Sequence, residues 1–181
     1  MTRTTMPTVD RMLLALLTLA ALHAPTSLAA QGAPPGCRTP MHRQFDFWIG
    51  DWTVTDSAGK TVYGRNRITN EEDGCAIHEH WTSAGNPVTT GQSLNGYDFL
   101  TKGWSQDWIG SGGDVLHLRG GLRDGKMVLE GEGLTPAGAK IMHRAIWSLE
   151  PDGRVRQFWV TSANGGATWD PFFDGWYRKE R

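Results

Sequence analysis

The sequence predicts an all-β protein, an antiparallel up-and-down barrel of about ten strands with a short N-terminal helix over one mouth. From residue 50 onward, apolar residues recur with a period close to two, and no stretch keeps helical spacing over ten residues. Turn sequences, several of them with Asp-Gly or Asn-Gly pairs that supply the positive φ of tight hairpins, interrupt this pattern at short intervals. These turns are SAGK (57–60), EEDG (71–74), SAGNP (83–87), TKG (101–103), GSGG (110–113), RDGK (123–126), TPAGA (135–139), PDGR (151–154) and ANGG (163–166).

The segments between these turns are the expected strands. They span residues 50–57, 60–69, 75–83, 88–99, 103–109, 114–119, 125–132, 139–149, 154–162 and 171–179. A long antiparallel meander must protect its edge strands, and closure into a barrel removes those edges completely. A two-sheet sandwich is the alternative, but a short hairpin at every junction favours the barrel.

The first thirty residues have the pattern of a secretory signal peptide. Arg3 and Arg11 precede the apolar run LLALLTLAAL (13–22), and SLAA (27–30) supplies small residues for cleavage. The apolar run is shorter than the roughly 20 residues that a membrane-spanning helix needs. The sequence around Cys37 lacks the pattern of a lipid-anchor site, so we expect a secreted or periplasmic protein without a membrane anchor.

Residues 31–43 form a linker that carries Cys37, and the second cysteine of the chain is Cys75. In an oxidising compartment two cysteines are most simply explained as a disulfide. That bond would stabilise the fold by about 4 kcal/mol in the chain-entropy model. A zinc site with two cysteine ligands is the competing interpretation.

A short helix or turn is expected over residues 39–49. Thr39 can cap it, Pro40 suits its first position and Gly50 suits its end. Apolar residues at spacings of four and three form one stripe along it: Met41, Phe45 and Trp48.

Several stretches resemble a bacterial family of lipocalin-like (calycin) proteins of uncharacterised function, over nearly all of residues 44–179. They are FDFWIGDW (45–52), GCAIHEHW (74–81), SLNGYD (93–98), WSQDWI (104–109) and VRQFWVTSANGGATW (155–169). The resemblance implies a lipocalin-like barrel over 44–181, with distant similarity to nitrobindin and fatty-acid-binding barrels. It also implies a structural plug at the closed end, in which an arginine of the last strand stacks on the tryptophan of a Gly-x-Trp motif. The plug residues are Trp48, Gly50, Trp52 and Arg178.

Polar residues on the otherwise apolar face of a strand indicate where a ligand would bind. Alternation places Glu79, Gln106 and Gln157 inward. The expected ligand-binding residues are Glu79, Trp81, Trp104, Gln106, Trp108, Trp147, Gln157 and Trp159. On strand 139–149 the more apolar face includes His143, but a shift of one residue would bring in Arg144 instead. Asn95 and Tyr97 are further candidates with no clear face.

These residues describe a pocket for a small hydrophobic molecule with a polar end, so the predicted function is binding or carriage of such a ligand. One alternative is a periplasmic acid–base enzyme of isomerase, cyclase or dehydratase type, with Glu79 as base and His143 beside it. A second alternative is a structural or protein-binding β module with a filled core.

Other partners and cofactors have weaker support. After signal removal the chain carries 16 basic and 18 acidic residues, a net charge of −2, which disfavours nucleic acid. His78 and His80 share one strand face, and His117 and His143 could join them around a metal, but such pairs are common on solvent-facing strands. Nitrobindins hold haem through a histidine near the C-terminus, and residues 144–181 contain none. No metal or cofactor is therefore predicted, and the oligomeric state stays open.

Overall fold

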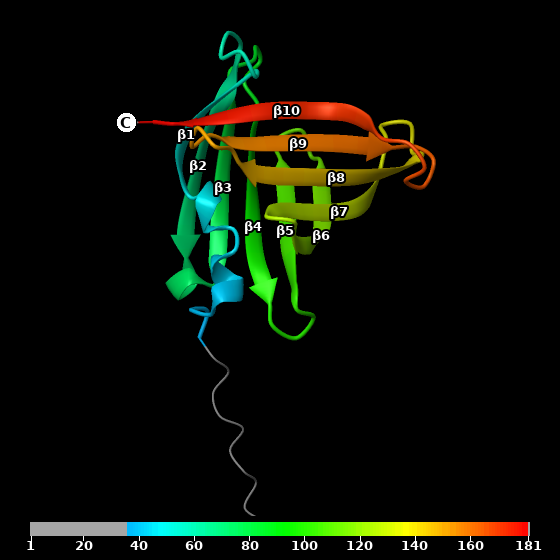
Figure 1. The fold of residues 1–181 in the computed structure, drawn as a ribbon. Helices are drawn as coiled ribbons and strands as arrows, with labels where there is room; N and C mark the ends of the chain where they lie inside the picture. The colour runs from blue at the N-terminus through cyan, green and yellow to red at the C-terminus, as the bar shows by residue number, and fades with distance from the viewer. Residues whose placement is uncertain (1–35, 181) are drawn as a thin grey trace, which may run out of the picture. The chain divides into compact units, whose positions relative to one another are not determined.

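The computed structural model describes residues 36–180, and the predicted signal peptide lies outside this range. Ten antiparallel strands form one closed barrel in which each strand pairs with its neighbours in sequence and β1 pairs with β10. The strands are β1 (Gly50–Thr55), β2 (Val62–Glu71), β3 (Ala76–Ser83), β4 (Thr90–Asp98), β5 (Gly103–Gly110), β6 (Val115–Arg123), β7 (Lys126–Leu134), β8 (Lys140–Leu149), β9 (Val155–Ser162) and β10 (Asp170–Lys179). In Figure 1, β2–β4 run upright while β7–β10 cross them.

The predicted all-β barrel is confirmed, and the strand limits differ from the expected ones by a few residues at most. The largest difference is at β6, which was expected to end at residue 119. Instead it continues to Arg123, because Gly120 and Gly121 pair with Leu129 and Val128 of β7. A glycine pair that reads as a turn is here part of the ladder.

The segment before β1 forms two short 3₁₀ turns, η1 (Pro40–Arg43) and η2 (Asp46–Trp48), where a single short helix was one expectation. The predicted apolar stripe is only partly correct. Phe45 and Trp48 are fully buried, but Met41 is 45% exposed and His42 takes the buried position. The tighter 3₁₀ winding and the break at Phe45 change which side chains face the barrel.

Aromatic rings from this segment plug one end of the barrel. Phe45 stacks on Trp48 with ring centroids 4.9 Å apart and meets Trp147 and Trp104 edge-on at 5.3 and 5.7 Å. Trp52 donates a hydrogen bond from Nε1 to the carbonyl oxygen of Trp48 (2.8 Å). The FDFWIGDW stretch is therefore core packing, which closes this end.

The cation nearest to Trp52 differs from the expected one. Lys179 Nζ lies 5.8 Å from the centroid of the Trp52 ring, and the two residues are partners in the β1–β10 ladder. Arg178 is one residue away on β10 and therefore projects from the opposite face, where it reaches Gly59. Strand alternation thus excludes the predicted stacking of Arg178 on Trp52.

The predicted disulfide between Cys37 and Cys75 is present, with Cα atoms 4.8 Å apart. It ties the chain before η1 to the turn that precedes β3. Arg43 reinforces the junction, since its Nη2 donates hydrogen bonds to the carbonyl oxygens of Cys37 (3.2 Å) and Gly74.

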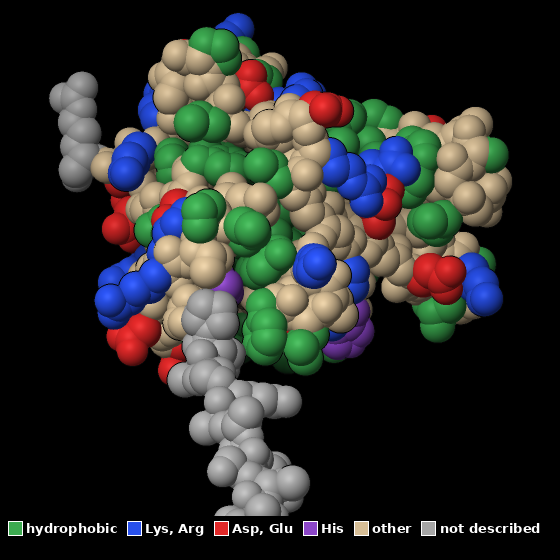
Figure 2. Space-filling model, turned by 60° about the horizontal axis from the view of Figure 1, so that its bottom comes forward, with side chains coloured by type: hydrophobic (Ala, Val, Ile, Leu, Met, Phe, Trp, Pro, Cys, Tyr) green, Lys and Arg blue, Asp and Glu red, His purple; other side chains and the backbone are tan. Residues whose placement is uncertain are grey.

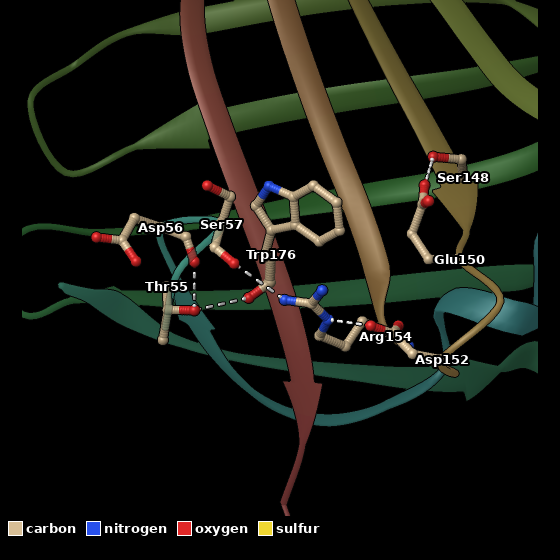
Figure 3. A network of polar contacts seen from close by, with 8 residues as sticks. All are labelled: Thr55, Asp56, Ser57, Ser148, Glu150, Asp152, Arg154 and Trp176. Carbon is tan, nitrogen blue, oxygen red and sulfur yellow. Dashed lines mark hydrogen bonds and ion pairs between the residues drawn. The ribbon is translucent and has the colours of Figure 1, made fainter. Parts of the chain in front are cut away.

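A network on the outer surface holds the seam where β1 meets β10 (Figure 3). Arg154, from the turn before β9, lies over the ring of Trp176 at 4.4 Å. Its guanidinium donates to Asp152 (2.8 Å) and to the carbonyl oxygen of Ser57 (3.3 Å), beyond the end of β1. One side chain therefore crosses β10 to connect two loops that are far apart in the sequence.

The outer surface also exposes apolar side chains. Figure 2 brings the lower end of Figure 1 forward and shows hydrophobic side chains across it, between charged side chains of both signs. In residues 36–180, no helix is long and apolar enough to cross a membrane.

Candidate functional site

A cavity of about 700 Å³ occupies the barrel interior beyond the aromatic plug. It opens at the other mouth, where β2 and β10 begin and the loop from β3 to β4 passes, since Val62, Phe172 and residues 83–87 line it. Its walls are rich in aromatic residues from five strands. They are Tyr63, Trp81, Trp108, Trp159, Phe172, Phe173 and Tyr177.

The three tryptophans of the cavity are each held in place by neighbours. Trp108 of β5 donates a hydrogen bond from Nε1 to Asp114 (2.8 Å), and its ring lies directly against Gly91 of β4. Trp159 of β9 donates from Nε1 to His143 Nδ1 (3.2 Å). Trp81 of β3 meets Phe173 edge-on, with ring centroids 6.4 Å apart. The apolar wall is therefore fixed in shape before a ligand arrives.

A layer of hydrogen-bonded side chains lies around Glu79, which is 5% exposed and lines the cavity. Ser93 Oγ donates to Glu79 Oε2 (2.6 Å), and Asn66 Nδ2 donates to Oε1 (2.7 Å). Asn95 Nδ2 and Gln106 Nε2 both donate to Ser93 Oγ, at 3.0 and 3.3 Å. Because Ser93 Oγ accepts twice, its single proton is directed to the carboxyl group of Glu79.

The layer continues across β10 to β9. Asn66 Nδ2 also donates to the Tyr177 hydroxyl (3.3 Å), and that hydroxyl donates to Gln157 Oε1. Asn95 is fixed in turn, because its Nδ2 donates to the carbonyl oxygen of Ile77 (3.0 Å). Buried polar groups that are bonded to one another in this way hold the cavity floor rigid.

Burial shifts the ionisation of two groups in this layer. Desolvation raises the pKa of Glu79, and the hydrogen bonds from Ser93 and Asn66 oppose that shift only in part. Desolvation and the neighbouring Glu79 carboxyl raise the pKa of Tyr177 well above its usual range. The site thus favours neutral forms of both groups when no ligand charge is present.

The structure separates the predicted ligand-binding residues into two sets. Lining the cavity are Glu79, Trp81, Gln106, Trp108, Gln157 and Trp159. Trp104 and Trp147 instead belong to the aromatic plug, packed against Phe45. Both face inward as expected, but they lie at the closed end of the barrel. Alternation along a strand predicts which face a residue occupies, but not its position along the barrel axis.

The alternative between His143 and Arg144 is resolved by the register of β8. Ala145 and Trp147 are buried inside, so His143 shares their inward face. Desolvation lowers the pKa of His143. Arg144 points outward, where it pairs with Glu130 (2.5 Å) and lies over the Trp169 ring at 3.9 Å. Within residues 36–180, neither a hydrogen bond nor an ion pair joins His143 to Glu79, as the acid–base alternative would require.

Sequence reasoning missed three members of the polar layer: Asn66, Ser93 and Tyr177. The sequence did contain a signal for Asn66. Arg65 and Arg67 on either side of it must face solvent, so alternation places Asn66 inside the barrel. On β4 the sequence pattern indicates the wrong inward face. The apolar Leu94 points outward and is 54% exposed, while the inward positions carry the polar residues Ser93 and Asn95.

Of the histidines considered as metal ligands, only His78 and His80 lie together, with ring centroids 3.9 Å apart. His78 and His80 lie on the outer face of β3, where His78 Nε2 is 3.0 Å from Gln92 Oε1. His117 pairs with Asp107 on the outer face of β5 and β6 (2.7 Å). In the part of the chain that the structure describes, no three histidine, cysteine, aspartate or glutamate side chains are grouped as a metal site would require.

The chain matches neither the models of known protein families nor any curated protein.

Proposed function

We propose that this protein binds and carries a small, mostly apolar molecule inside its barrel. The observation that carries the proposal is the cavity of about 700 Å³, open at one mouth and walled by aromatic side chains. Its volume falls in the range of about 300–1,000 Å³ that is typical of small-molecule sites. Burial of an apolar ligand against these rings supplies affinity at roughly 25 cal/mol per Å² of apolar surface, before the costs of association.

The polar layer supports specificity at one end of the ligand. Glu79, Gln106 and Gln157 reach the cavity from β3, β5 and β9, and hydrogen bonds to other buried side chains hold each of them. A rigid polar group below an apolar wall orients a ligand without reorganising when it binds.

We also propose that the protein is exported and belongs with the lipocalin-like proteins that its motifs resemble. The signal-like N-terminus and the Cys37–Cys75 disulfide support an oxidising compartment. The closed antiparallel barrel with an interior cavity suits a carrier of this type.

An acid–base enzyme is the second candidate, and the burial of Glu79 on the cavity floor favours it. The raised pKa of Glu79 suits either role, proton donor or base. Glu79 is the only carboxyl among the described residues that line the cavity, and no histidine or lysine there would relay its proton. Binding therefore explains more of the site than turnover does.

The test is a titration of the purified protein with phenylnaphthylamine, a probe that is uncharged at neutral pH and fluoresces in apolar surroundings. We expect saturable binding with one probe per chain. The Ala145→Phe variant would fill the cavity, because Ala145 is 1% exposed and lines it. Binding should then fall by at least about tenfold, a loss of 1.4 kcal/mol.

The matched control is Ile146→Phe, which adds a similar ring one residue along β8 on the outer face. This variant should bind the probe like the wild type. Equal binding by Ala145→Phe, Ile146→Phe and wild type would place the probe outside the barrel and overturn the proposal.

A further inference from the structure

Beside Glu79 and Gln106 the polar atoms that remain free on the cavity floor are hydrogen-bond acceptors, whereas the free donors among the described residues of the layer lie on β9, on the amide nitrogen of Gln157, whose Oε1 accepts from Tyr177. Each carboxyl oxygen of Glu79 accepts one hydrogen bond from the protein and has a further lone pair. Gln106 uses its two amide protons on Asn95 (2.9 Å) and Ser93 (3.3 Å), which leaves its Oε1 without a protein donor in residues 36–180. Gln106 is only 5% exposed and lines the cavity.

The same excess of acceptors extends one residue deeper. Asn66 Oδ1 is fully buried and has no hydrogen-bond partner among the described residues, although the amide nitrogen of the same side chain is bonded to Glu79. Buried acceptors without donors are rare in folded proteins. Asn66 does not line the cavity, so this acceptor adds to the acceptor-rich character of the layer without itself contacting a ligand.

The charges around the cavity are equally one-sided. Among the described residues that line it there is no lysine, arginine or histidine, and Glu79 is the only acidic residue. Residues 36–180 offer Glu79 no ion-pair partner, whereas the partly buried pairs Arg144–Glu130 and Arg156–Asp174 lie on the outer face of the barrel. An anionic ligand would meet no compensating charge here.

From this arrangement we infer that the ligand carries an amine at its polar end, held as an ammonium group between the Glu79 carboxylate and Gln106 Oε1. This inference rests on the proposed ligand-binding function. An ammonium group has three donors and no acceptor, which matches the free acceptors of Glu79 and Gln106, two cavity-lining residues that are both hydrogen-bonded to Ser93 Oγ. The aromatic wall supports the same chemistry, since indole faces such as that of Trp81 attract cations.

An amine ligand would also supply the positive charge that the buried carboxyl group of Glu79 lacks within the described residues. In the free protein burial raises the pKa of Glu79 and so favours its protonated form. An ammonium ligand favours the ionised form instead; any proton on Glu79 passes to solvent as the ligand binds, and the two charges neutralise each other inside the barrel. A ligand hydroxyl would bring a single donor and no charge, and would gain less from the same site.

The test compares three competitors with the same apolar chain: octylamine, octanol and octanoate. Each displaces phenylnaphthylamine from the wild-type protein, and the midpoint gives its affinity. We expect octylamine to bind at least about tenfold more tightly than octanol, as a charge-assisted hydrogen bond implies, and octanoate to bind weakest.

Two variants locate the effect. Glu79→Gln keeps the shape of the side chain, and in this variant the ratio of octylamine affinity to octanol affinity should fall to about one. Glu132→Gln makes the same chemical change on the exposed outer face of β7 and should keep the preference.

A measurement on wild type alone covers the case in which Glu79→Gln does not fold. Octylamine affinity should rise as pH increases above 4.5, the ordinary pKa of a glutamate carboxyl, because ionisation of Glu79 supplies the charge that pairs with the ammonium group, while octanol affinity should not rise. The other titratable groups near Glu79 are Tyr177, whose pKa is raised, and His78 on the outer face of the same strand. Glu132→Gln, which retains His78, should show the same profile.

The outcomes separate the two proposals. If octanol binds as tightly as octylamine, or if the preference persists in Glu79→Gln, the amine inference is wrong while ligand binding stands. If phenylnaphthylamine and all three octyl compounds fail to bind folded wild type, the proposed function itself fails.

Discussion

The ring of Trp108 lies against the backbone of Gly91 on the neighbouring strand, where even a methyl group at position 91 would overlap the ring. Gly91→Ala should therefore displace Trp108 from the cavity wall. We expect phenylnaphthylamine affinity to fall about tenfold, with a stability cost of roughly 1–3 kcal/mol, as overpacking usually brings. Probe titration and urea unfolding measure the two effects. Gly121→Ala is the control, because a Cβ there meets nothing within 4 Å. Equal effects of both substitutions would contradict the role of Gly91.

Ser93 connects Glu79 with Asn95 and Gln106 at the centre of the polar layer. Ser93→Ala removes one donor and one shared acceptor from a buried network. The free energy of unfolding should fall by about 1–3 kcal/mol, the usual cost of unpaired buried polar groups. Urea denaturation checks this value. Ser105→Ala on the outward face of β5 should change it little, and a Ser93→Ala variant as stable as wild type would show that the layer does not depend on Ser93.

Glu79 makes stability depend on pH. Its pKa in the folded protein is raised above the ordinary value of 4.5, so the folded state holds this proton more tightly than the unfolded chain does. The resulting stabilisation is complete below pH 4.5 and is lost as pH rises through the folded-state pKa. Chemical unfolding between about pH 4 and pH 8 should show this loss in wild type and not in Glu79→Gln. Parallel pH profiles for the two proteins would mean that the pKa of Glu79 is not raised.

The Cys37–Cys75 disulfide fixes the segment that plugs the barrel. Replacing both cysteines with serine should lower the free energy of unfolding by about 2–5 kcal/mol, the usual cost of removing a native disulfide from a small domain. Guanidinium unfolding of the double variant and of the oxidised wild type gives the difference. A reducing agent should weaken wild type to the level of the variant and leave the variant unchanged. An effect of the reducing agent on the variant would point to another cause.

Much of this fold could be predicted because local signals agree along the chain. Asp-Gly and Asn-Gly turns separate segments with period-two alternation, and only hairpin connections satisfy both. Glu79 and Gln106 were found as ligand-binding candidates because each is a polar residue on an apolar strand face.

The errors arise where position depends on three-dimensional packing. Trp104 and Trp147 lie in the plug because the residues of FDFWIGDW reach that end of the barrel. Lys179, and not the predicted Arg178, is the cation near Trp52, because the β1–β10 register pairs Lys179 with Trp52. Ser93 was missed because β4 places small polar residues inside and leaves Leu94 exposed, against the usual alternation.

Native mass spectrometry of the folded protein mixed with phenylnaphthylamine and octanol tests the central claim most directly, because it counts bound molecules. The account predicts a single bound molecule on wild type, lost on unfolding and absent from Ala145→Phe. Folded wild-type protein that carries no ligand, or an Ala145→Phe variant that carries as much as wild type, would contradict a ligand-binding barrel.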